Sequence, residues 1–151
     1  MAKKGQVKLS SAEELRFLKV PGVQKEVSTA EVRQIAEVDY PLFSFRWLQD
    51  YSIDGCRDAK FFHDVLMRMQ KLSELGWDGI RRSARHSFGM ESIPVGQIKP
   101  KVLPQIITPD VKNLHVLRAV GDNRPMVGLQ QGKIFHVIFL EANFGDVYNH
   151  G

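Results

Sequence analysis

The strongest constraint on the fold is a series of three apolar segments near the end of the sequence. The segments are LHVLRAV (114–120), PMVGLQ (125–130) and KIFHVIFL (133–140). They are joined by GDNR and QG, short polar connections that are typical of hairpin turns. Apolar segments of this length, separated by such turns, pair with their neighbours as β-strands. The sequence therefore predicts an antiparallel meander in this part of the chain.

Upstream of the meander, the sequence predicts one strand and two helices. Aromatic and polar residues alternate in FSFRW (43–47), which is the period of a half-buried strand. In DAKFFHDVLMRMQKLSEL (58–75) the apolar residues recur at helical spacing, and Asp58 is a suitable N-cap. Gly76 is expected to break this helix. A second, shorter helix is expected to end in RRSARHSFG (81–89).

The order of these elements predicts an α+β fold in which a helical hairpin packs on a C-terminal antiparallel sheet. Residues 41–151 are expected to form this single domain. Within it, residues 90–112 carry four of the seven prolines and are expected to form an extended connection. Residues 1–40 contain two Ser-x-x-Glu capping-box patterns but few large apolar residues, so we expect a short helical N-terminal arm.

Composition limits the classes of function. A chain of 151 residues that is 43% hydrophobic can bury the core of one domain. No apolar run approaches the ~18 residues of a membrane span, and MAKKGQVKLSS lacks the apolar region of a secretory signal. We therefore expect a cytoplasmic protein with no membrane partner. The single cysteine, Cys56, excludes an internal disulfide framework and a cysteine-built zinc site. No glycine-rich phosphate-binding motif is present, and no cofactor is expected.

The formal net charge of +4 arises in the middle of the chain. Residues 56–101 hold nine Lys and Arg against five Asp and Glu, which accounts for the whole excess. A local excess of positive charge favours an acidic partner such as RNA, DNA or an acidic protein segment. A solvated surface without a partner is the alternative, and cations at a helix end also stabilise the helix. The candidate RNA-binding residues are Arg81, Arg82, Arg85, His86, Lys99 and Lys101.

The sequence also contains the side chains that RNA cleavage requires. Attack by the 2′-hydroxyl of RNA on its own phosphate needs a base, an acid and cations that stabilise the developing charge. Histidine suits the first two roles and arginine the third. The candidate catalytic residues are Arg118, Arg124, His136, Tyr148 and His150. Each has a plain structural alternative: a core histidine, a solvated arginine in a turn, or a tyrosine that covers the edge of the core.

The segments LHVLRAV, DNRPMVGL and KIFHVIFLEANFGDVY resemble the last strands of the RelE/ParE superfamily of bacterial toxins. The resemblance covers roughly residues 43–151, and Arg118, Arg124 and Tyr148 are the positions that match. It implies a small basic α+β domain with a first strand, a helical hairpin and a curled antiparallel sheet. Ribonuclease members of this superfamily cut messenger RNA without a metal, usually on the ribosome, and other members poison gyrase. The resemblance also implies an antitoxin protein as partner.

The leading prediction is a metal-independent endoribonuclease that resembles RelE-type toxins and cleaves mRNA through 2′-hydroxyl attack. Two features depart from the family pattern. The turn 141–145 (EANFG) lacks the basic residue that RNA-cleaving members often place there, and residues 1–40 have no counterpart in the minimal fold. The missing basic residue favours a second prediction, a non-catalytic RNA-binding or protein-interaction module with the same basic face. A third is an enzyme of another class that holds a metal between its histidines.

Overall fold

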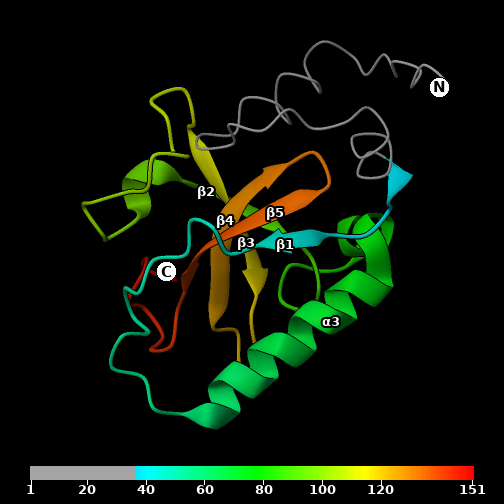
Figure 1. Cartoon of the computed structure of the whole chain (residues 1–151), viewed down its shortest axis with the longest axis horizontal. Coiled ribbons are helices and arrows are strands. Elements are labelled where there is room, and N and C mark those ends of the chain that lie inside the picture. The colour runs from blue at the N-terminus through cyan, green and yellow to red at the C-terminus, as the bar shows by residue number, and fades with distance from the viewer. Residues whose placement is uncertain (1–36) are drawn as a thin grey trace, which may run out of the picture.

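The three apolar segments at the end of the sequence form the centre of a five-stranded sheet (Figure 1). In this computed structural model the described part of the chain is residues 37–151, so the predicted arm lies outside it apart from residues 37–40. The sheet order is β1-β5-β4-β3-β2, and all neighbouring strands are antiparallel except β1 and β5, which are parallel. The strands are β1 Leu42–Ser44, β2 Glu91–Pro94, β3 Asn113–Arg118, β4 Pro125–Gln131 and β5 Ile134–Leu140.

The predicted meander is confirmed as β3, β4 and β5, whereas the flanking strands differ from the prediction. β1 ends at Ser44 because the chain turns there, with Leu48 N donating to Phe45 O. β2 lies inside the segment that was expected to be an extended connection. Its last residue, Pro94, sits at the end of an edge strand, which is a position where a sheet tolerates proline. A 3₁₀ turn, η1 (Val95–Gln97), follows β2.

The expected α+β content is present, but the helical hairpin is wrong. One helix, α3 (Ala59–Arg82), begins at the predicted N-cap Asp58, whose carboxylate accepts from Lys60 N and Phe61 N. Gly76 interrupts α3 as expected, with φ 76° and ψ 167°. Its lack of a Cβ matters because that atom would lie 3.1 Å from Asp39 O. The part of α3 beyond Gly76 ends at Arg82 and is only about 1.7 turns long, so it makes no second antiparallel helix.

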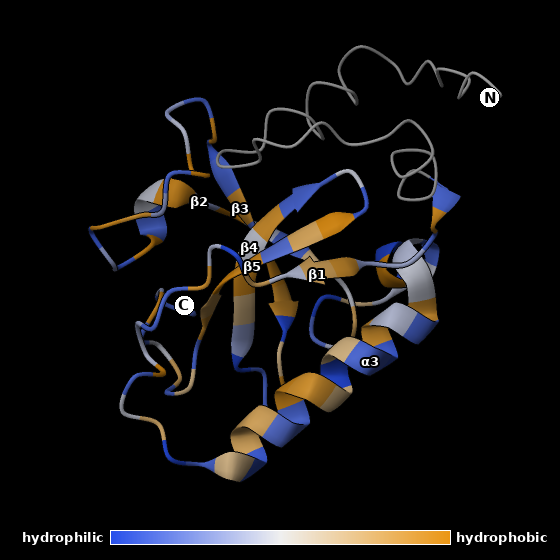
Figure 2. Cartoon of the chain, viewed as in Figure 1, coloured by the Kyte–Doolittle hydropathy of each residue, from blue (hydrophilic) through white to orange (hydrophobic). Residues whose placement is uncertain are grey.

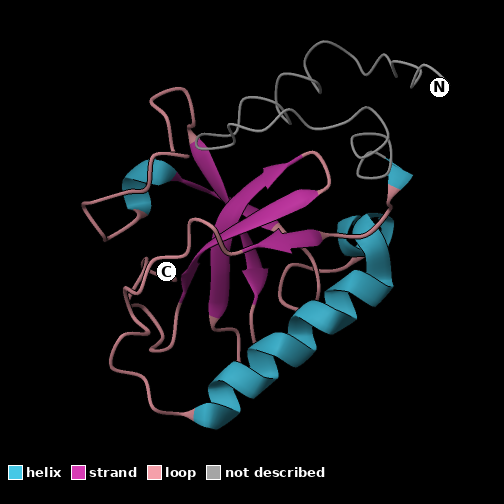
Figure 3. Cartoon of the chain, in the orientation of Figure 1, coloured by secondary structure: helices cyan, strands magenta, loops and turns pink. Residues whose placement is uncertain are grey.

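Two separate apolar cores lie on the two faces of the sheet. On the first face α3 packs against strand residues that include Leu117, Phe135 and Val137. On the second face irregular segments and the short 3₁₀ turn η1, rather than an α-helix, bury residues that include Leu114 and Phe139 (Figure 3). Apolar and polar residues alternate along α3, as expected for a helix with one buried face (Figure 2). No helix within residues 37–151 is long and apolar enough to cross a membrane.

A β-bulge in β5 determines on which face of the sheet the residues after β5 lie. Val127 pairs with Phe139 but Gly128 pairs with Val137, so Ile138 is an extra residue in β5. Its carbonyl accepts a hydrogen bond from Gln49 N at 2.8 Å. Phe135 and Val137 therefore face the first core, whereas Phe139 faces the second. One extra residue reverses the alternation of a strand, so the bulge redirects the segment after β5.

The bulge depends on Gly128, which gives a testable prediction. A Cβ at Gly128 would lie 2.0 Å from the backbone oxygen of His136. This oxygen belongs to the paired strand β5, so it cannot move aside without distorting the sheet. We expect Gly128→Ala to lower the free energy of unfolding by about 3 kcal/mol, the upper end for overpacking. Gly96→Ala is the matched control, because nothing lies within 4 Å of its added Cβ. Urea denaturation of both variants checks this, and equal stabilities would contradict it.

Candidate functional site

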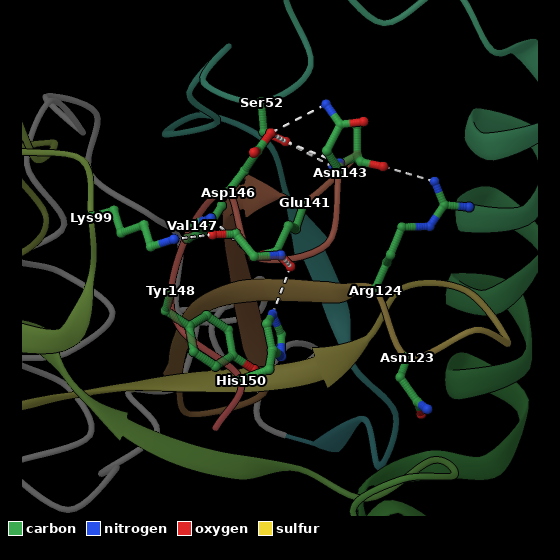
Figure 4. Close-up of polar contacts among 12 residues, drawn as sticks. Ser52, Lys99, Asn123, Arg124, Glu141, Asn143, Asp146, Val147, Tyr148 and His150 are labelled. Atoms are coloured by element: carbon green, nitrogen blue, oxygen red, sulfur yellow. Dashed lines mark hydrogen bonds and ion pairs between the residues drawn. The ribbon is translucent and has the colours of Figure 1, made fainter.

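The candidate site lies at the end of the second sheet face, where β3 and β5 finish and β2 begins. Arg118 ends β3 on the same face as Leu114 and Val116, as the strand alternation predicts. Glu91 begins β2 opposite Val116. Glu141 follows β5 directly, and the bulge turns it toward the same face. The segment after it, residues 141–151, folds back over this end of the sheet (Figure 4).

The carboxylate of Glu141 is the centre of this segment. The side chain is fully buried, at 0% exposure. Its Oε1 accepts from Gly145 N at 2.6 Å and lies 2.6 Å from His150 Nε2, and its Oε2 accepts from Val147 N at 2.9 Å. A buried carboxylate is tolerated when every lone pair that faces the protein has a donor, and here two backbone amides and an imidazole supply them.

His150 is held by this carboxylate and by two aromatic rings. Its ring stacks on Phe144 with centroids 4.0 Å apart and lies tilted against Tyr148 at 4.1 Å. The hydrogen bond to the Glu141 carboxylate requires the proton on Nε2, so the neutral ring carries its lone pair on Nδ1. The side chain keeps 11% exposure, and Nδ1 has no protein partner within residues 37–151. His150 therefore presents a free basic nitrogen while a carboxylate orients the ring from behind.

Arg118 and Tyr148 form the buried side of the site. Arg118 Nη2 donates to Glu91 Oε1 at 2.7 Å, and Nη1 lies 3.4 Å from the Tyr148 hydroxyl oxygen. Arg85 Nη1 approaches the other oxygen of Glu91 at 3.7 Å from the surface. Burial raises the pKa of the Tyr148 phenol, and Arg118 only partly opposes this, so the phenol keeps its proton. Arg118 is 6% exposed and acts on its neighbours rather than on a ligand in solvent.

Two further cations hold the segment after β5 from opposite sides (Figure 4). Lys99 Nζ donates to Gly145 O, and Lys99 N donates to Val147 O at 2.7 Å. Arg124, in the β3–β4 turn, donates from Nη1 to Ala142 O at 2.8 Å and pairs with Asp122. Its guanidinium also lies over the ring of Phe61 in α3, 4.6 Å from the centroid. Lys99 is thus at the exposed edge of the site, whereas Arg124 braces the loop against the helix.

An acidic cleft borders the same loop on another side. It encloses about 700 Å³, and its lining includes Asp50, Ser52, Asp54, Arg57, Asn143 and Asp146. Ser52, at φ 75°, accepts from Ala142 N at 2.9 Å and donates to Asp146 Oδ2 at 2.9 Å. Three carboxylates against one arginine repel phosphate groups. An anionic ligand would therefore approach His150 from the side of Lys99.

The structure brings together only part of the expected catalytic set. Arg118, Tyr148 and His150 are in contact, and Arg124 touches the same loop. His136 lies in β5, five residues before Glu141. Five residues of extended strand span about 16 Å, so the two side chains are far apart. Its Nε2 bonds to Gln131 Oε1 at 3.0 Å, and its Nδ1 is buried without a partner in the described chain. His136 is thus a core histidine at the other end of the strand.

The expected RNA-binding residues are divided in the same way. Arg85 and Lys99 border the site, and His86 lies beside Arg85, whose Nε is 3.2 Å from His86 Nε2. Arg81 and Arg82 are the last residues of α3. This end of the helix lies near the β4–β5 turn, since Trp77 Nε1 donates to Lys133 O. That turn is at the opposite end of the sheet from His150. Lys101 is exposed and makes no polar contact within residues 37–151.

Sequence reasoning missed Glu141, Glu91 and Phe144. In the sequence, Glu141 is only the first residue of the turn 141–145, which lacks the basic residue of the toxin pattern. The sequence does contain a signal for its role. Glu141 directly follows a predicted buried strand and precedes His150 by nine residues, so it is a candidate for a carboxylate that orients this histidine. Among residues 37–151, no group of three or more His, Cys, Asp or Glu side chains is placed to hold a metal ion. The arrangement offers acid–base chemistry by an imidazole that a carboxylate orients, in a loop that a lysine also contacts.

Comparisons with protein-family models, with curated proteins and with solved structures found no match to this chain. Function is therefore inferred from the geometry of residues 85–150 at this end of the sheet. The features that bear on it are the buried carboxylate, the histidine that this carboxylate orients and the cations beside them.

The role of Glu141 gives a prediction about stability. In Glu141→Gln one carboxylate oxygen becomes an NH₂ group, which cannot accept from Gly145, Val147 or His150. We expect the free energy of unfolding to fall by about 1–3 kcal/mol, the range for a buried polar group left unsatisfied. Glu74→Gln, at an exposed position of α3, should change it by less than about 0.5 kcal/mol. Chemical denaturation measures both, and an unaffected Glu141→Gln protein would show that the loop does not depend on this carboxylate.

The two strand histidines give a prediction about pH. Burial lowers the pKa of His136 and of His115, so below about pH 6.5 the unfolded chain takes up protons that the folded chain does not. Stability should therefore fall as the pH is lowered from about 7.5 to about 5, by at most about 1.4 kcal/mol per pH unit for each histidine. His136→Gln should make this decline shallower, and the exposed His63→Gln should not. Unfolding free energies at several pH values test it; parallel curves for His136→Gln and wild type would refute it.

Proposed function

We propose that this protein is a metal-independent endoribonuclease in which His150 is the acid–base residue. The observation that supports the proposal is the 2.6 Å contact of His150 Nε2 with the buried Glu141 carboxylate, which leaves Nδ1 as a free base. A carboxylate in this position fixes the tautomer of the imidazole and stabilises the imidazolium that forms when it takes a proton. No other histidine in residues 37–151 has a buried carboxylate behind it.

The reaction would use the 2′-hydroxyl of the RNA as nucleophile. His150 Nδ1 removes the hydroxyl proton, the 2′-oxygen bonds to the adjacent phosphorus, and the bond to the 5′-oxygen breaks. The departing 5′-oxygen takes a proton from the Lys99 ammonium, and the proton held by the His150 imidazolium passes to solvent, from which Lys99 is protonated again. The products are a 2′,3′-cyclic phosphate and a free 5′-hydroxyl. The ammonium of Lys99, bonded to Gly145 in the same loop, is the cation that this site offers to the developing phosphate charge and to the departing oxygen. Arg118 and Glu91 position Tyr148, against which His150 lies.

The resemblance to RelE-type toxins supports the biological part of the proposal. The resemblance implies a first strand, a helical hairpin and an antiparallel sheet, and the described chain has the first strand and the sheet but the single helix α3 in place of the hairpin. On this basis the substrate is mRNA, including mRNA on the ribosome, the partner is an antitoxin protein, and the compartment is the cytoplasm. These three points depend on the resemblance, whereas the role of His150 depends on the site.

A second candidate function is a non-catalytic RNA-binding or protein-interaction module. One observation favours it: the guanidinium groups of Arg118 and Arg124 are already bonded to Glu91 and Asp122, so neither is free for a phosphate. Lys99 then remains at the surface of the site, together with Arg85, whose exposed guanidinium pairs with Glu91 at the longer distance of 3.7 Å. Such a surface binds RNA backbone but stabilises a transition state less than an arginine fork does.

Cleavage of a labelled mRNA by the purified protein distinguishes the two functions. We expect His150→Gln to reduce the cleavage rate by about 10²- to 10⁴-fold, the usual contribution of an acid–base residue. Glutamine can still donate to Glu141, so the loop should keep its fold. EDTA should have no effect, and the 5′ fragment should carry a cyclic phosphate. The reaction is run with and without ribosomes, because the family members usually act there.

Two histidine variants serve as controls for this experiment. His63→Gln, exposed on α3, should cleave at the wild-type rate. His136→Gln tests the other histidine of the candidate catalytic set, and we expect a rate within a few fold of wild type. RNA that is bound but left intact by wild-type protein would favour the non-catalytic module. Cleavage that depends on His136 and not on His150 would show that the site has been assigned to the wrong end of β5.

A further inference from the structure

Phe144 is an exposed aromatic ring in a loop whose backbone is firmly held. Its relative exposure is 59%, although it lies between Glu141 and His150, both of which are largely buried. The residues on each side of it are fixed: Ala142 N bonds to Ser52, and Gly145 N bonds to Glu141. The loop thus presents a large apolar surface to solvent from a fixed position, which distinguishes it from an apolar side chain on a mobile loop.

Phe144 is also the outermost ring of a stack. The rings of Phe144 and His150 are 24° from parallel with centroids 4.0 Å apart, and His150 in turn lies against the buried Tyr148. One face of the phenyl ring is therefore occupied by His150. The exposure of the side chain is accounted for by its other face and edge. Planar groups prefer to extend an offset stack of this kind, so the open face is suited to another flat ring.

A positive charge is held at the residue that follows Phe144. Lys99 Nζ donates to the carbonyl of Gly145, the residue next to Phe144 (Figure 4). The side chain of Lys99 is 46 positions away in sequence, and its backbone is bonded to Val147 O, so this placement is built into the fold. A flat ring carrying a negative group nearby would satisfy both features. Nucleobases in single-stranded nucleic acid have this combination, and base pairing in a duplex hides their faces.

We propose that Phe144 is a stacking platform for one unpaired base of single-stranded RNA. The base lies on the open face of Phe144, about 3.5–4 Å from the ring, and its phosphate lies toward Lys99. This arrangement brings the neighbouring sugar and phosphodiester to the edge of the stack, where His150 Nδ1 is accessible. This inference rests on the proposed function, because it concerns the substrate of the same site. It specifies that the substrate is unpaired rather than duplex RNA.

Binding of labelled 2′-O-methyl RNA tests the platform separately from cleavage. The methyl group blocks the attacking hydroxyl, so the full-length protein can bind this RNA but cannot cut it. Fluorescence anisotropy is measured with a single-stranded oligomer and with an abasic oligomer of the same backbone. We expect Phe144→Ala to weaken binding of the base-bearing oligomer by about 5- to 150-fold. Binding of the abasic oligomer should be unchanged.

Three further measurements make the result specific to stacking. Phe144→Trp should retain the wild-type affinity, because it keeps an aromatic face. Phe45→Ala removes another exposed aromatic, on the β1 side, and should have no effect. Duplex RNA should bind more weakly than the single strand and should not respond to Phe144→Ala. Circular dichroism verifies that each variant is folded.

Three outcomes separate this inference from the nuclease proposal. If wild-type protein cleaves RNA and Phe144→Ala weakens base-bearing and abasic oligomers equally, the platform is refuted and the nuclease stands. If binding depends on Phe144 and on bases but no RNA is cleaved, the platform stands and the protein is a binding module. If wild-type protein discriminates neither bases from abasic backbone nor single strand from duplex, the platform is overturned whatever the cleavage result.

Discussion

The buried carboxylate of Glu141 is the interaction on which the rest of the candidate site depends. Removing an ionised carboxylate from water costs several kcal/mol unless donors replace the lost hydration. Gly145, Val147 and His150 supply these donors from within nine residues of the same chain. The segment therefore has to adopt the one conformation that brings two backbone N–H groups and an imidazole to a single point. In this way a local electrostatic requirement fixes the position of the histidine.

The carboxylate reaches that position because of the bulge at Ile138. A regular β5 would place Glu141 on the same face as Phe135 and Val137, against α3. The extra residue moves it to the second face, where no α-helix within residues 37–151 covers the sheet and a loop can close over it. Gly128 makes room for the bulge on the partner strand. A backbone irregularity in the centre of the sheet therefore determines the chemistry at its end.

Much of this fold could be predicted from the sequence, because patterns of period two and 3.6 are local. The three strands of the meander, the N-cap Asp58 and the break at Gly76 each follow from nearby residues. β2 could not be found in this way, because its pairing with β3 is long-range and prolines surround it. The prediction of a helical hairpin was wrong because the spacing of apolar residues and Gly76 shows where the first helix breaks, but not how soon the helical segment after it ends. For the site, residue types identified Tyr148 and His150, but burial and the bulge were needed to find Glu141.

The contrast between His136 and His150 shows why residue type alone is insufficient. Both are histidines near the second sheet face, and both use Nε2 to bond an oxygen of a side chain. The partner of His136 is the neutral amide of Gln131, and burial lowers its pKa, so this ring resists taking a proton. The partner of His150 is the carboxylate of Glu141, and its second nitrogen has no partner within residues 37–151. Acid–base chemistry requires a ring that can gain and lose a proton within one cycle. The sheet supplies the same side chain in two environments, and the proposed function uses the one at its end, whose Nδ1 is not buried in the core.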